Sequence, residues 1–355
     1  MNLLEGKGRL LFTVIMQAIV HTGAGGPEVL ALREVAAPDP GAGQVRVRVR
    51  AVGLNRADLL QRRGAYPAPP GWPADIPGLE YAGEVERSGP GVTRWKVGDR
   101  VMGLVGGGAH SEYVIVHQDE ALPVPAELSW TDAASIPEAF LTAYDALMTR
   151  GRLKHGERVL LHAAGSGVGT AAIQLAREAG AMVLGTSRTP AKLAALSALG
   201  LEVGIDTSSR SFREQITVPV DLIVDVLGGP AFADNLAILA PRGRLVILGL
   251  LQGPIAPQAD LTPILRKRLE IIGTVMRTRG LEERVPLVTE FRTRVLPLFG
   301  SHVATEEPLR SAGRPERRPG ALRPVVHAVF PMADIAAAHR EMEANRGVGK
   351  IVLTW

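Results

Sequence analysis

The sequence contains no cysteine. Without thiols the chain cannot form disulfides, Cys-ligated zinc sites, iron–sulfur clusters, thiolate nucleophiles or redox dithiols. Any redox chemistry must therefore be carried by a bound cofactor. Histidine and carboxylate ligands remain available for a metal, but the eight histidines show no HExxH or comparable spacing. We therefore predict no metal site.

Aromatic residues and long apolar runs are also scarce. Phe, Trp and Tyr make up only 4% of a chain that is 46% hydrophobic, so its cores must be aliphatic. No stretch reaches 18 apolar residues, which excludes a transmembrane helix. The length of 355 residues suggests two domains, because a domain usually holds about 100–200 residues.

The first residues superficially resemble a short signal peptide, because Lys7 and Arg9 precede an apolar run at residues 10–20. That run contains Gln17, and no Ala-x-Ala cleavage site follows it. We favour a leader over residues 1–15 that lies outside the fold, with a first strand beginning at Met16. This interpretation predicts a cytoplasmic protein, and it leaves open whether the chain starts at Met1 or Met16.

Net charge is small, since 40 basic and 36 acidic residues give +4. No run of five or six basic residues occurs, although arginine is enriched near 310–323. The sequence therefore gives only weak support for nucleic-acid binding. Residues 301–324 are rich in Arg and Pro and poor in apolar residues, which predicts a mobile surface loop. A polyanion-binding arm is the alternative.

Residues 16–130 have the character of β structure. Residues 44–52 alternate Val with Arg, the period-2 pattern of a half-solvated antiparallel strand. Dense Gly and Pro punctuation separates further short strands. Together these features predict a barrel-like β domain.

The pattern changes near residue 137, where helical spacing begins and then gives way to apolar strands alternating with amphipathic helices. Near-continuous apolar strands are typical of a parallel sheet covered on both faces. We therefore predict a doubly wound α/β domain, followed by a closing segment that packs back onto the first domain. The predicted strands are 158–162, 181–186, 220–226, 244–250, 268–276 and 350–353, and the predicted helices are 137–150, 170–180, 190–199 and 333–345.

The strongest local signal is a turn of small residues between the strand at 158–162 and the following helix. In that context the backbone N–H groups of such a turn can approach a pyrophosphate at the helix N-terminus. The alternative is that small residues serve only tight packing of helix on strand. The predicted dinucleotide contacts here are Ala163, Ala164, Gly165, Ser166, Gly167, Val168 and Gly169.

The choice of cofactor depends on the end of the second strand of this domain. NAD enzymes place an acidic residue there, whereas this chain has Thr186, Ser187 and Arg188, with Lys192 one turn later. Because Arg188 and Lys192 could pair a 2′-phosphate, NADPH is the predicted cofactor. Arg188 as a solvated loop charge is the alternative.

Several ordered motifs resemble the zinc-free quinone oxidoreductases of the medium-chain dehydrogenase/reductase superfamily, in particular the subgroup of the tumour-suppressor-induced quinone reductase. They cover about residues 16–300 and 325–354. The resemblance implies a GroES-like β-rich catalytic domain over 16–137 and 281–355, with 301–324 as an inserted loop, and a Rossmann domain over 138–280. The carrying segments are 52–64, 66–71, 77–83, 95–101, 136–139, the glycine turn and 344–352.

The same resemblance points to a metal-free reaction. Zinc-dependent relatives place a metal-binding cysteine where this chain has Asn55. Without a Lewis acid alcohol oxidation is disfavoured, whereas a quinone already accepts hydride readily. The resemblance implies that Asn55 and Tyr66 line the cleft and hydrogen-bond a quinone oxygen. Each has a structural alternative, and Asp58 is interpreted as a cap or ion-pair partner and His162 as a packed strand-end residue.

The family's other cofactor contacts fall on residues of the two domains and of the closing strand. The related reductase also carries an aromatic residue that covers the adenine, where this chain has Gly204, Ile205 and Asp206. An acidic Asp206 near a 2′-phosphate would oppose the basic pair. The implied contacts are Thr142, the Glu138–Ala139 turn, Gly249, Leu250, Met276, Arg277 and Lys350.

These inferences predict an NADPH-dependent quinone reductase that forms a homodimer. One alternative reduces an activated C=C bond, as in an enone or alkenal. The other is a non-catalytic relative that binds NADPH or RNA.

Overall fold

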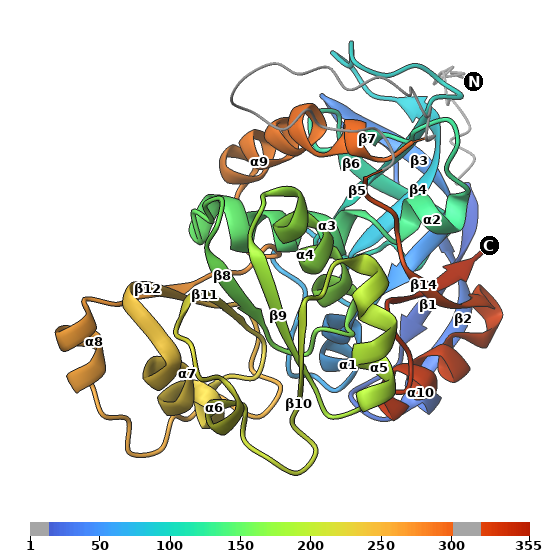
Figure 1. Ribbon diagram of the computed structural model, residues 1–355. Helices are drawn as coiled ribbons and strands as arrows, with labels where there is room; N and C mark the ends of the chain where they lie inside the picture. Colours follow the sequence, from blue (N-terminus) through green and yellow to red (C-terminus); the bar gives the residue numbers. More distant parts are fainter. Residues whose placement is uncertain (1–13, 301–320) are drawn as a thin grey trace, which may run out of the picture.

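The computed structural model describes residues 14–300 and 321–355. Two large sheets organise these residues: a mostly antiparallel one at the right of Figure 1 and a parallel one toward its lower left. The two-domain α/β fold predicted from the sequence, with a GroES-like part and a Rossmann-like parallel sheet, is confirmed. The predicted leader falls mainly, and the predicted Arg/Pro loop almost entirely, outside the described residues.

The first sheet has seven strands. Its order is β14 (Val326–Pro331), β15 (Lys350–Thr354), β3 (Gln44–Leu54), β4 (Glu80–Ser88), β5 (Arg100–Leu104) and β7 (Leu122–Pro123), and β6 (Tyr113–His117) also pairs with β3. A separate antiparallel pair joins β1 (Ile15–His21) to β2 (Leu30–Ala36). The first sheet is therefore built from both ends of the described chain.

Strand β3 departs from the predicted half-solvated pattern at one position. Arg48 and Arg50 are exposed as predicted, but the side chain of Arg46 is only 1% exposed. Its guanidinium donates to Glu86 (2.7 Å) and to Asp39 (3.2 Å). The expectation that Arg46 faces solvent is wrong because two carboxylates compensate its burial.

The second sheet is parallel and has six strands. Its order is β10 (Val203–Asp206), β9 (Met182–Ser187), β8 (Arg158–Leu161), β11 (Val220–Asp225), β12 (Leu239–Ile247) and β13 (Glu270–Gly273). The predicted strand 244–250 ends earlier, at Ile247, because the chain turns there and Leu248 N–H donates to Asp225 O (2.9 Å).

The helices connect these strands and join the two sheets. The predicted helix 137–150 is regular only to Tyr144 and continues as a π-helical turn over Asp145–Arg150. In that turn the buried Asp145 carboxylate accepts hydrogen bonds from Arg279 and Thr274. The helices are α1 (Arg56–Arg62), α2 (Trp130–Ala134), α3 (Pro137–Tyr144), α4 (Gly167–Glu178), α5 (Pro190–Leu196), α6 (Phe212–Gln215), α7 (Phe232–Ile238), α8 (Thr262–Lys267), α9 (Leu281–Arg294) and α10 (Ile335–Ala344).

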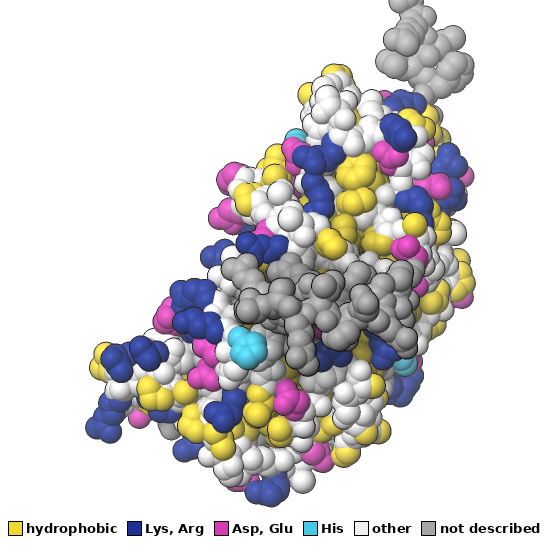
Figure 2. All heavy atoms as spheres, turned by 45° about the horizontal axis from the view of Figure 1, so that its top comes forward, with side chains coloured by type: hydrophobic (Ala, Val, Ile, Leu, Met, Phe, Trp, Pro, Cys, Tyr) yellow, Lys and Arg dark blue, Asp and Glu magenta, His cyan; other side chains and the backbone are white. Residues whose placement is uncertain are grey.

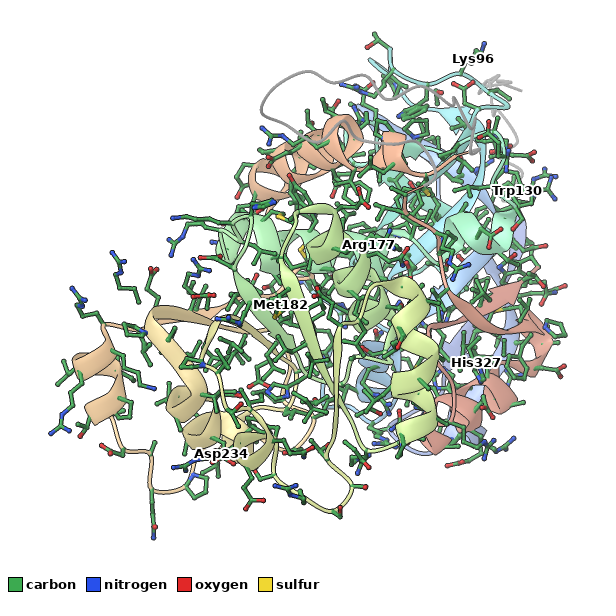
Figure 3. All side chains as sticks on the ribbon, in the orientation of Figure 1. Lys96, Trp130, Arg177, Met182, Asp234 and His327 are labelled. Carbon is green, nitrogen blue, oxygen red and sulfur yellow. The ribbon has the colours of Figure 1, made fainter. Side chains whose placement is uncertain are left out.

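The closing segment crosses the parallel-sheet side before it joins the first sheet. Arg177 on α4, labelled in Figure 3, donates to Ala321 O (2.9 Å), and Gln174 exchanges hydrogen bonds with the backbone of Arg323. Strand β15 then pairs antiparallel with β3, so that Ile351 faces Leu54. This register places Lys350 beside Asn55, at the start of α1.

Within the described residues, no helix combines the length and apolar character needed to cross a membrane. On the face shown in Figure 2, Lys and Arg side chains are interspersed with Asp and Glu around the grey atoms. This face of the described residues carries no single large basic patch.

Candidate active site

The glycine turn lies between β8 and α4, as the sequence predicts. Ser166 is the N-cap of α4, and its hydroxyl accepts the Gly169 N–H (3.0 Å). Gly169 must be glycine because a Cβ there would collide with the carbonyl oxygen of Ala164. Among the described residues, we find no hydrogen-bond partner for the Val168 N–H, the second of α4, whereas Gly167 adjoins the bridge between residues 166 and 349.

The unpaired Val168 amide at this helix end fits the predicted anion site, because the N-terminus of a helix favours negative charge. The turn is hydrogen-bonded to strand β9, because the Ala164 N–H donates to Thr186 O (3.0 Å). Within the turn, Ala163 adopts a left-handed conformation with φ of 49°. The residues present therefore suit a pyrophosphate group.

The closing segment covers this turn. Gly349 N–H donates to Gly165 O (3.0 Å), and residues 166 and 349 form an isolated parallel bridge. A Cβ on Gly167 would lie 2.5 Å from Cδ of Lys350, so the lysine stem packs directly on the turn. One lysine thus contacts the glycine turn with its aliphatic stem and the first sheet with its ammonium group.

The ammonium group of Lys350 is buried and fully hydrogen-bonded. It donates to Leu54 O (3.0 Å), to Asn55 Oδ1 and to Glu80 Oε1 (2.6 Å). Because an ammonium has three hydrogens, none remains for a cofactor in this arrangement. Lys350 was predicted as a cofactor contact, and the structure brings its stem, not its charge, to the glycine turn.

The amide of Asn55 is held just as firmly. Its Nδ2 donates to Glu80 Oε1 (2.9 Å) and Gly53 O (3.2 Å), and its Oδ1 accepts from Lys350. Both amide hydrogens are used inside the protein, so no N–H is left for the oxygen of a substrate. In this structure Asn55 offers an acceptor, whereas the expected role was that of a donor.

Asp58 closes the same cluster from the first turn of α1. Its carboxylate accepts the Asn55 N–H (2.7 Å) and the Gly78 N–H (3.2 Å), which matches the predicted capping role. Burial raises the pKa of Asp58 to about 6, partly offset by these hydrogen bonds and by the charge of Lys350.

Glu138 lies next to Glu80 at the start of α3. The backbone N–H of Glu138 donates to Glu80 Oε2 (2.8 Å). Burial raises the pKa of the Glu138 carboxyl to about 7, and the negative charge of Glu80 acts in the same direction. Among the described residues no hydrogen bond or ion pair reaches the carboxyl group of Glu138.

Tyr66 and Arg277 form the next contact, which joins the two halves of the molecule. The Arg277 guanidinium lies 4.8 Å from the centre of the Tyr66 ring and donates to Tyr66 O (2.9 Å). It also donates to Gly106 O (2.8 Å) and Gln61 Oε1 (2.6 Å). Burial raises the pKa of Tyr66, and the guanidinium acts in the opposite direction.

Thr142 and Met276 are buried on the same side of the site. The Thr142 hydroxyl finds no hydrogen-bond partner among the described residues, although it is buried. Such a group costs free energy unless a ligand satisfies it, so it fits the predicted cofactor contact. Met276 and Arg277 line a cavity of about 20 Å³ together with Glu138.

The basic end of the glycine turn is more open. Arg188 is exposed, and Lys192 donates to Asn345 O (2.6 Å) just beyond α10. Burial and the nearby positive charges of Arg188 and Arg56 lower the pKa of Lys192. Asp206, whose charge would oppose a 2′-phosphate, lies opposite Ser187 in the strand register.

The remaining predicted residues occupy the carboxyl ends of the parallel strands. Buried His162 bonds Thr186 (3.0 Å) and Asn235 (2.8 Å), which leaves neither ring nitrogen free, and burial lowers its pKa to about 4. Gly249 is half-buried beside Val226, and Leu250 is exposed. Sequence reasoning did not assign a role to Asp225, whose pKa burial raises to about 6.

Glu80 is a buried residue of the candidate site that sequence reasoning missed. It is fully buried and receives hydrogen bonds from Asn55, Lys350 and the backbone of Glu138. The available signal was a single charge in an otherwise apolar stretch of strand, since buried charges need a partner. Among the described residues, no cluster of three or more His, Asp or Glu could hold a metal ion.

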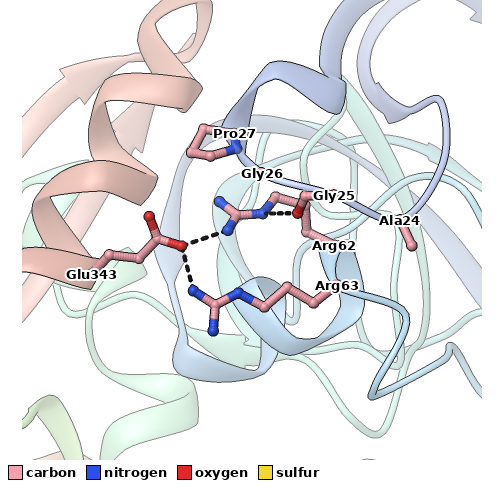
Figure 4. A pocket seen from close by; sticks show the side chains of 7 residues that line it. All are labelled: Ala24, Gly25, Gly26, Pro27, Arg62, Arg63 and Glu343. Atoms are coloured by element: carbon pink, nitrogen blue, oxygen red, sulfur yellow. Dashed lines mark hydrogen bonds and ion pairs between the residues drawn. The ribbon is translucent and has the colours of Figure 1, made fainter.

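A third cluster joins α1 to α10 near the basic end. Glu343 receives hydrogen bonds from Arg62 and Arg63 (2.6 Å for Arg63) at the edge of a cavity of about 460 Å³, shown in Figure 4. Arg62 also donates to Gly25 O (3.1 Å). The single carboxylate leaves the pair of arginines with a net positive charge.

Two family descriptions match the chain. “Alcohol dehydrogenase GroES-like domain” matches residues 41–126, and “Zinc-binding dehydrogenase” matches residues 167–293. The chain therefore matches both the GroES-like domain and the cofactor-binding domain of the dehydrogenases that these two descriptions cover.

Relatives match over nearly the whole chain. A “Quinone oxidoreductase” of Pseudomonas aeruginosa is 34% identical over 340 residues, covering 93% of this chain and 96% of its own length. The human “Synaptic vesicle membrane protein VAT-1 homolog” is 31% identical over 358 residues, covering 96% of this chain and 86% of its own.

Solved structures agree. A human VAT-1 homolog-like protein superposes with a TM-score of 0.80 at 26% identity, covering 96% of this chain and 98% of its own. The CurK enoyl reductase superposes with a TM-score of 0.79 at 28% sequence identity. The match covers 96% of this chain and 99% of the enoyl reductase chain. A mycobacterial protein complexed with NADPH superposes with a TM-score of 0.77 at 28% sequence identity. The match covers 96% of this chain and 100% of the mycobacterial chain.

Proposed function

The chain belongs to the medium-chain dehydrogenase/reductase superfamily, and on that premise we propose that it reduces small quinones with NADPH. The coarser statement, an oxidoreductase of this superfamily that uses a nicotinamide cofactor, follows from the relatives and the domain matches. The observation that carries the finer proposal is the position of Lys350. This residue links the glycine turn to a cluster formed by the fully buried Glu80 and the half-buried Asn55 and Glu138.

In this proposal the parallel-sheet part, residues 138–280, holds the cofactor. The N-terminus of α4, with the free N–H of Val168, receives the pyrophosphate, and Thr142 supplies its unpaired hydroxyl near the nicotinamide. The carboxyl ends of the strands supply the remaining contacts, at Gly249, Leu250 and Met276. Residues 16–137 and 281–355 form the catalytic part that covers the acceptor.

NADPH is preferred to NADH because of charge. No acidic residue stands at Thr186–Arg188 to accept hydrogen bonds from an unphosphorylated ribose. Arg188 is exposed and free to pair a 2′-phosphate, and Lys192 and Arg56 add positive charge beside it. The bound mycobacterial neighbour contains NADPH, which supports this assignment.

A quinone is the preferred acceptor because it needs no polarising metal. The bound nicotinamide supplies a hydride, and the protein has only to position the acceptor and compensate the negative charge that develops on oxygen. Tyr66, with the Arg277 guanidinium against its ring, presents a phenol whose hydroxyl has no partner among the described residues. Asn55 and Lys350 keep the floor of the site rigid.

An activated C=C bond is the second candidate acceptor. An enoyl reductase is among the structural neighbours, and reduction of an enone also produces an oxyanion beside the same phenol. The two candidates therefore differ in the shape of the acceptor rather than in the charge that the site must compensate.

One steady-state experiment tests both candidates. NADPH oxidation is followed with ortho- and para-quinones, conjugated enones and alkenals, and with NADH in parallel. We expect quinones to be reduced fastest and NADPH to be used at lower concentration than NADH. Reduction of enones alone would favour the second candidate. NADPH binding, seen as quenching of tryptophan fluorescence, without any turnover would establish a binding protein instead.

We also propose a cytoplasmic homodimer. Strand β13 is an edge of the parallel sheet, and it carries the exposed apolar residue Ile271, followed by Val275. An exposed apolar edge strand favours pairing with a second copy. Sedimentation equilibrium should give twice the 37.7 kDa chain mass, and Ile271→Lys should shift the protein toward the monomer.

A further inference from the structure

The site contains few groups that can give a proton to a reduced acceptor. All three ammonium hydrogens of Lys350 and both amide hydrogens of Asn55 are used within the protein. Buried His162 is also engaged through both ring nitrogens. Among the described residues at this end of the site, oxygens without a hydrogen-bond partner remain on Tyr66, Thr142 and Glu138. The Thr142 hydroxyl is assigned to the cofactor, which leaves the Tyr66 phenol and the Glu138 carboxyl.

The surroundings of Glu138 suit a proton donor. Glu138 lines a cavity together with Met276 and Arg277, residues of the predicted cofactor contacts. The volume of about 20 Å³ has room for about one water molecule. Because no described residue hydrogen-bonds this carboxyl, a proton on it is free to leave toward the cavity.

The charges that face Glu138 come from every element around it. Glu80 on β4 and Asp58 on α1 disfavour its ionised form, whereas Lys350 on β15 and Arg277 favour that form. The Glu80 carboxylate forms an ion pair with the Lys350 ammonium (2.6 Å), and it also accepts a hydrogen bond from the Glu138 N–H. Together with burial, this arrangement raises the pKa of Glu138 to about 7, so the carboxyl keeps its proton at a higher pH than an ordinary glutamate does.

Tyr66 is the weaker candidate. Burial raises the pKa of its phenol above the usual value near 10. A phenol of this kind holds its proton tightly and is suited to hydrogen bonding rather than to proton release. The two groups then have separate tasks, since Tyr66 orients the acceptor oxygen and Glu138 protonates it.

We propose that Glu138, in its protonated form, is the catalytic acid that protonates the reduced acceptor. This inference rests on the proposed function. The hydride, one proton with two electrons, converts a quinone to the hydroquinone monoanion. The O–H bond of Glu138 then breaks, its proton forms the second O–H bond of the hydroquinone, and the Glu138 carboxylate regains a proton from water in the cavity.

The pH profile of quinone reduction tests this assignment in the full-length protein. In the wild type, kcat/KM should fall as the pH rises through about 7, because the acid must be protonated. Glu138→Gln should lower kcat by about 100-fold at pH 6 and remove this fall, since general acids contribute roughly 10²–10⁴-fold. Glu138→Asp should keep the fall at reduced rate. NADPH affinity should change by less than about twofold in both variants.

A titration without substrate provides an independent readout. Carbon NMR of protein with labelled glutamate carboxyls should show one resonance that titrates near pH 7 and is missing in Glu138→Gln. The matched control is Glu112→Gln, a half-buried glutamate whose carboxyl accepts the Gln17 N–H far from the cavity. The control should keep both the resonance and the pH profile.

The outcomes separate the two claims. Turnover in Glu138→Gln with the wild-type pH profile would overturn the role of Glu138 and leave the proposed function standing. No turnover of any acceptor by the wild type would overturn the proposed function, and the proton-donor role with it.

Discussion

The inner end of the candidate site, around Asn55 and Glu80, differs from its outer end, around Arg188 and Lys192. At the inner end charges are buried and each hydrogen is assigned to a partner, as in the contacts of Lys350. At the outer end Arg188 is exposed, and the largely buried Lys192 donates, among the described residues, one hydrogen bond, to Asn345 O. Buried charges depend strongly on one another, whereas exposed charges are screened by water and salt.

This difference has a functional meaning. A group at the inner end acts through its position and its pKa, and replacing one partner leaves another charge unpaired. A group at the outer end acts by attraction, so its loss weakens one ligand and leaves the protein intact. Substitutions at the two ends should therefore change different quantities.

The largest expected effect is on stability. Lys350→Met removes the partner of the buried Glu80 carboxylate and should lower the free energy of unfolding by about 3–5 kcal/mol. Denaturation by urea measures this change. Lys154→Met, at an exposed lysine, should stay within about 0.5 kcal/mol. An equally small loss for Lys350→Met would show that the Lys350–Glu80 ion pair does not stabilise the fold. If the pair does stabilise it, adding Glu80→Gln to Lys350→Met should recover part of the lost stability.

The next effect is the pH dependence of stability. Between about pH 4.5 and 7 the folded protein keeps a proton on Glu138 that the unfolded chain releases, so the free energy of unfolding falls as the pH rises. Glu138 contributes about 1–2 kcal/mol to this change in the free energy of unfolding. Because its side chain is only half-buried, solvent reduces the effect of the raised pKa. Asp58 contributes in the same direction with a pKa of about 6.

Urea denaturation at a series of pH values measures this slope. Glu138→Gln should make it shallower, whereas Glu112→Gln should leave it unchanged. A slope in Glu138→Gln equal to that of the wild type would mean that Glu138 ionises normally in the folded protein.

The smallest effect belongs to the outer end. Arg188→Ala should raise KM for NADPH by about tenfold and leave that for NADH within about twofold, because one charge-assisted contact to the 2′-phosphate is lost. Salt should weaken NADPH binding less in the variant than in the wild type. Arg210→Ala, at another exposed arginine of the same sheet side, should change neither constant. Equal losses for both cofactors would contradict a phosphate contact.

The sequence was most informative where function depends on neighbours along the chain. The glycine turn and the absence of an acid at Thr186–Arg188 are both local patterns. Helix α5 likewise begins after Thr189 and its last turn ends at Gly200, as predicted, because Pro190 and a left-handed glycine act locally.

Long-range pairing limited the rest. Asn55 and Lys350 are 295 residues apart, and their contact depends on the register of β15 against β3. Sequence reasoning therefore placed both residues in the site and missed that they hold each other. Arg46 followed an exposed pattern and is buried because Glu86, at a register shift in the neighbouring strand β4, accepts a hydrogen bond from its guanidinium.

The order of synthesis gives β15 a further consequence. Asn55, Glu80 and Glu138 leave the ribosome long before the lysine that fixes them, since Lys350 lies in the final strand. Until that strand is inserted beside β3, the Glu80 carboxylate lacks its cation and the glycine turn lacks its cover. A chain interrupted anywhere before β15 would therefore lack the cation beside Glu80 and the cover of the glycine turn, so the candidate site is completed only by the last strand to be made.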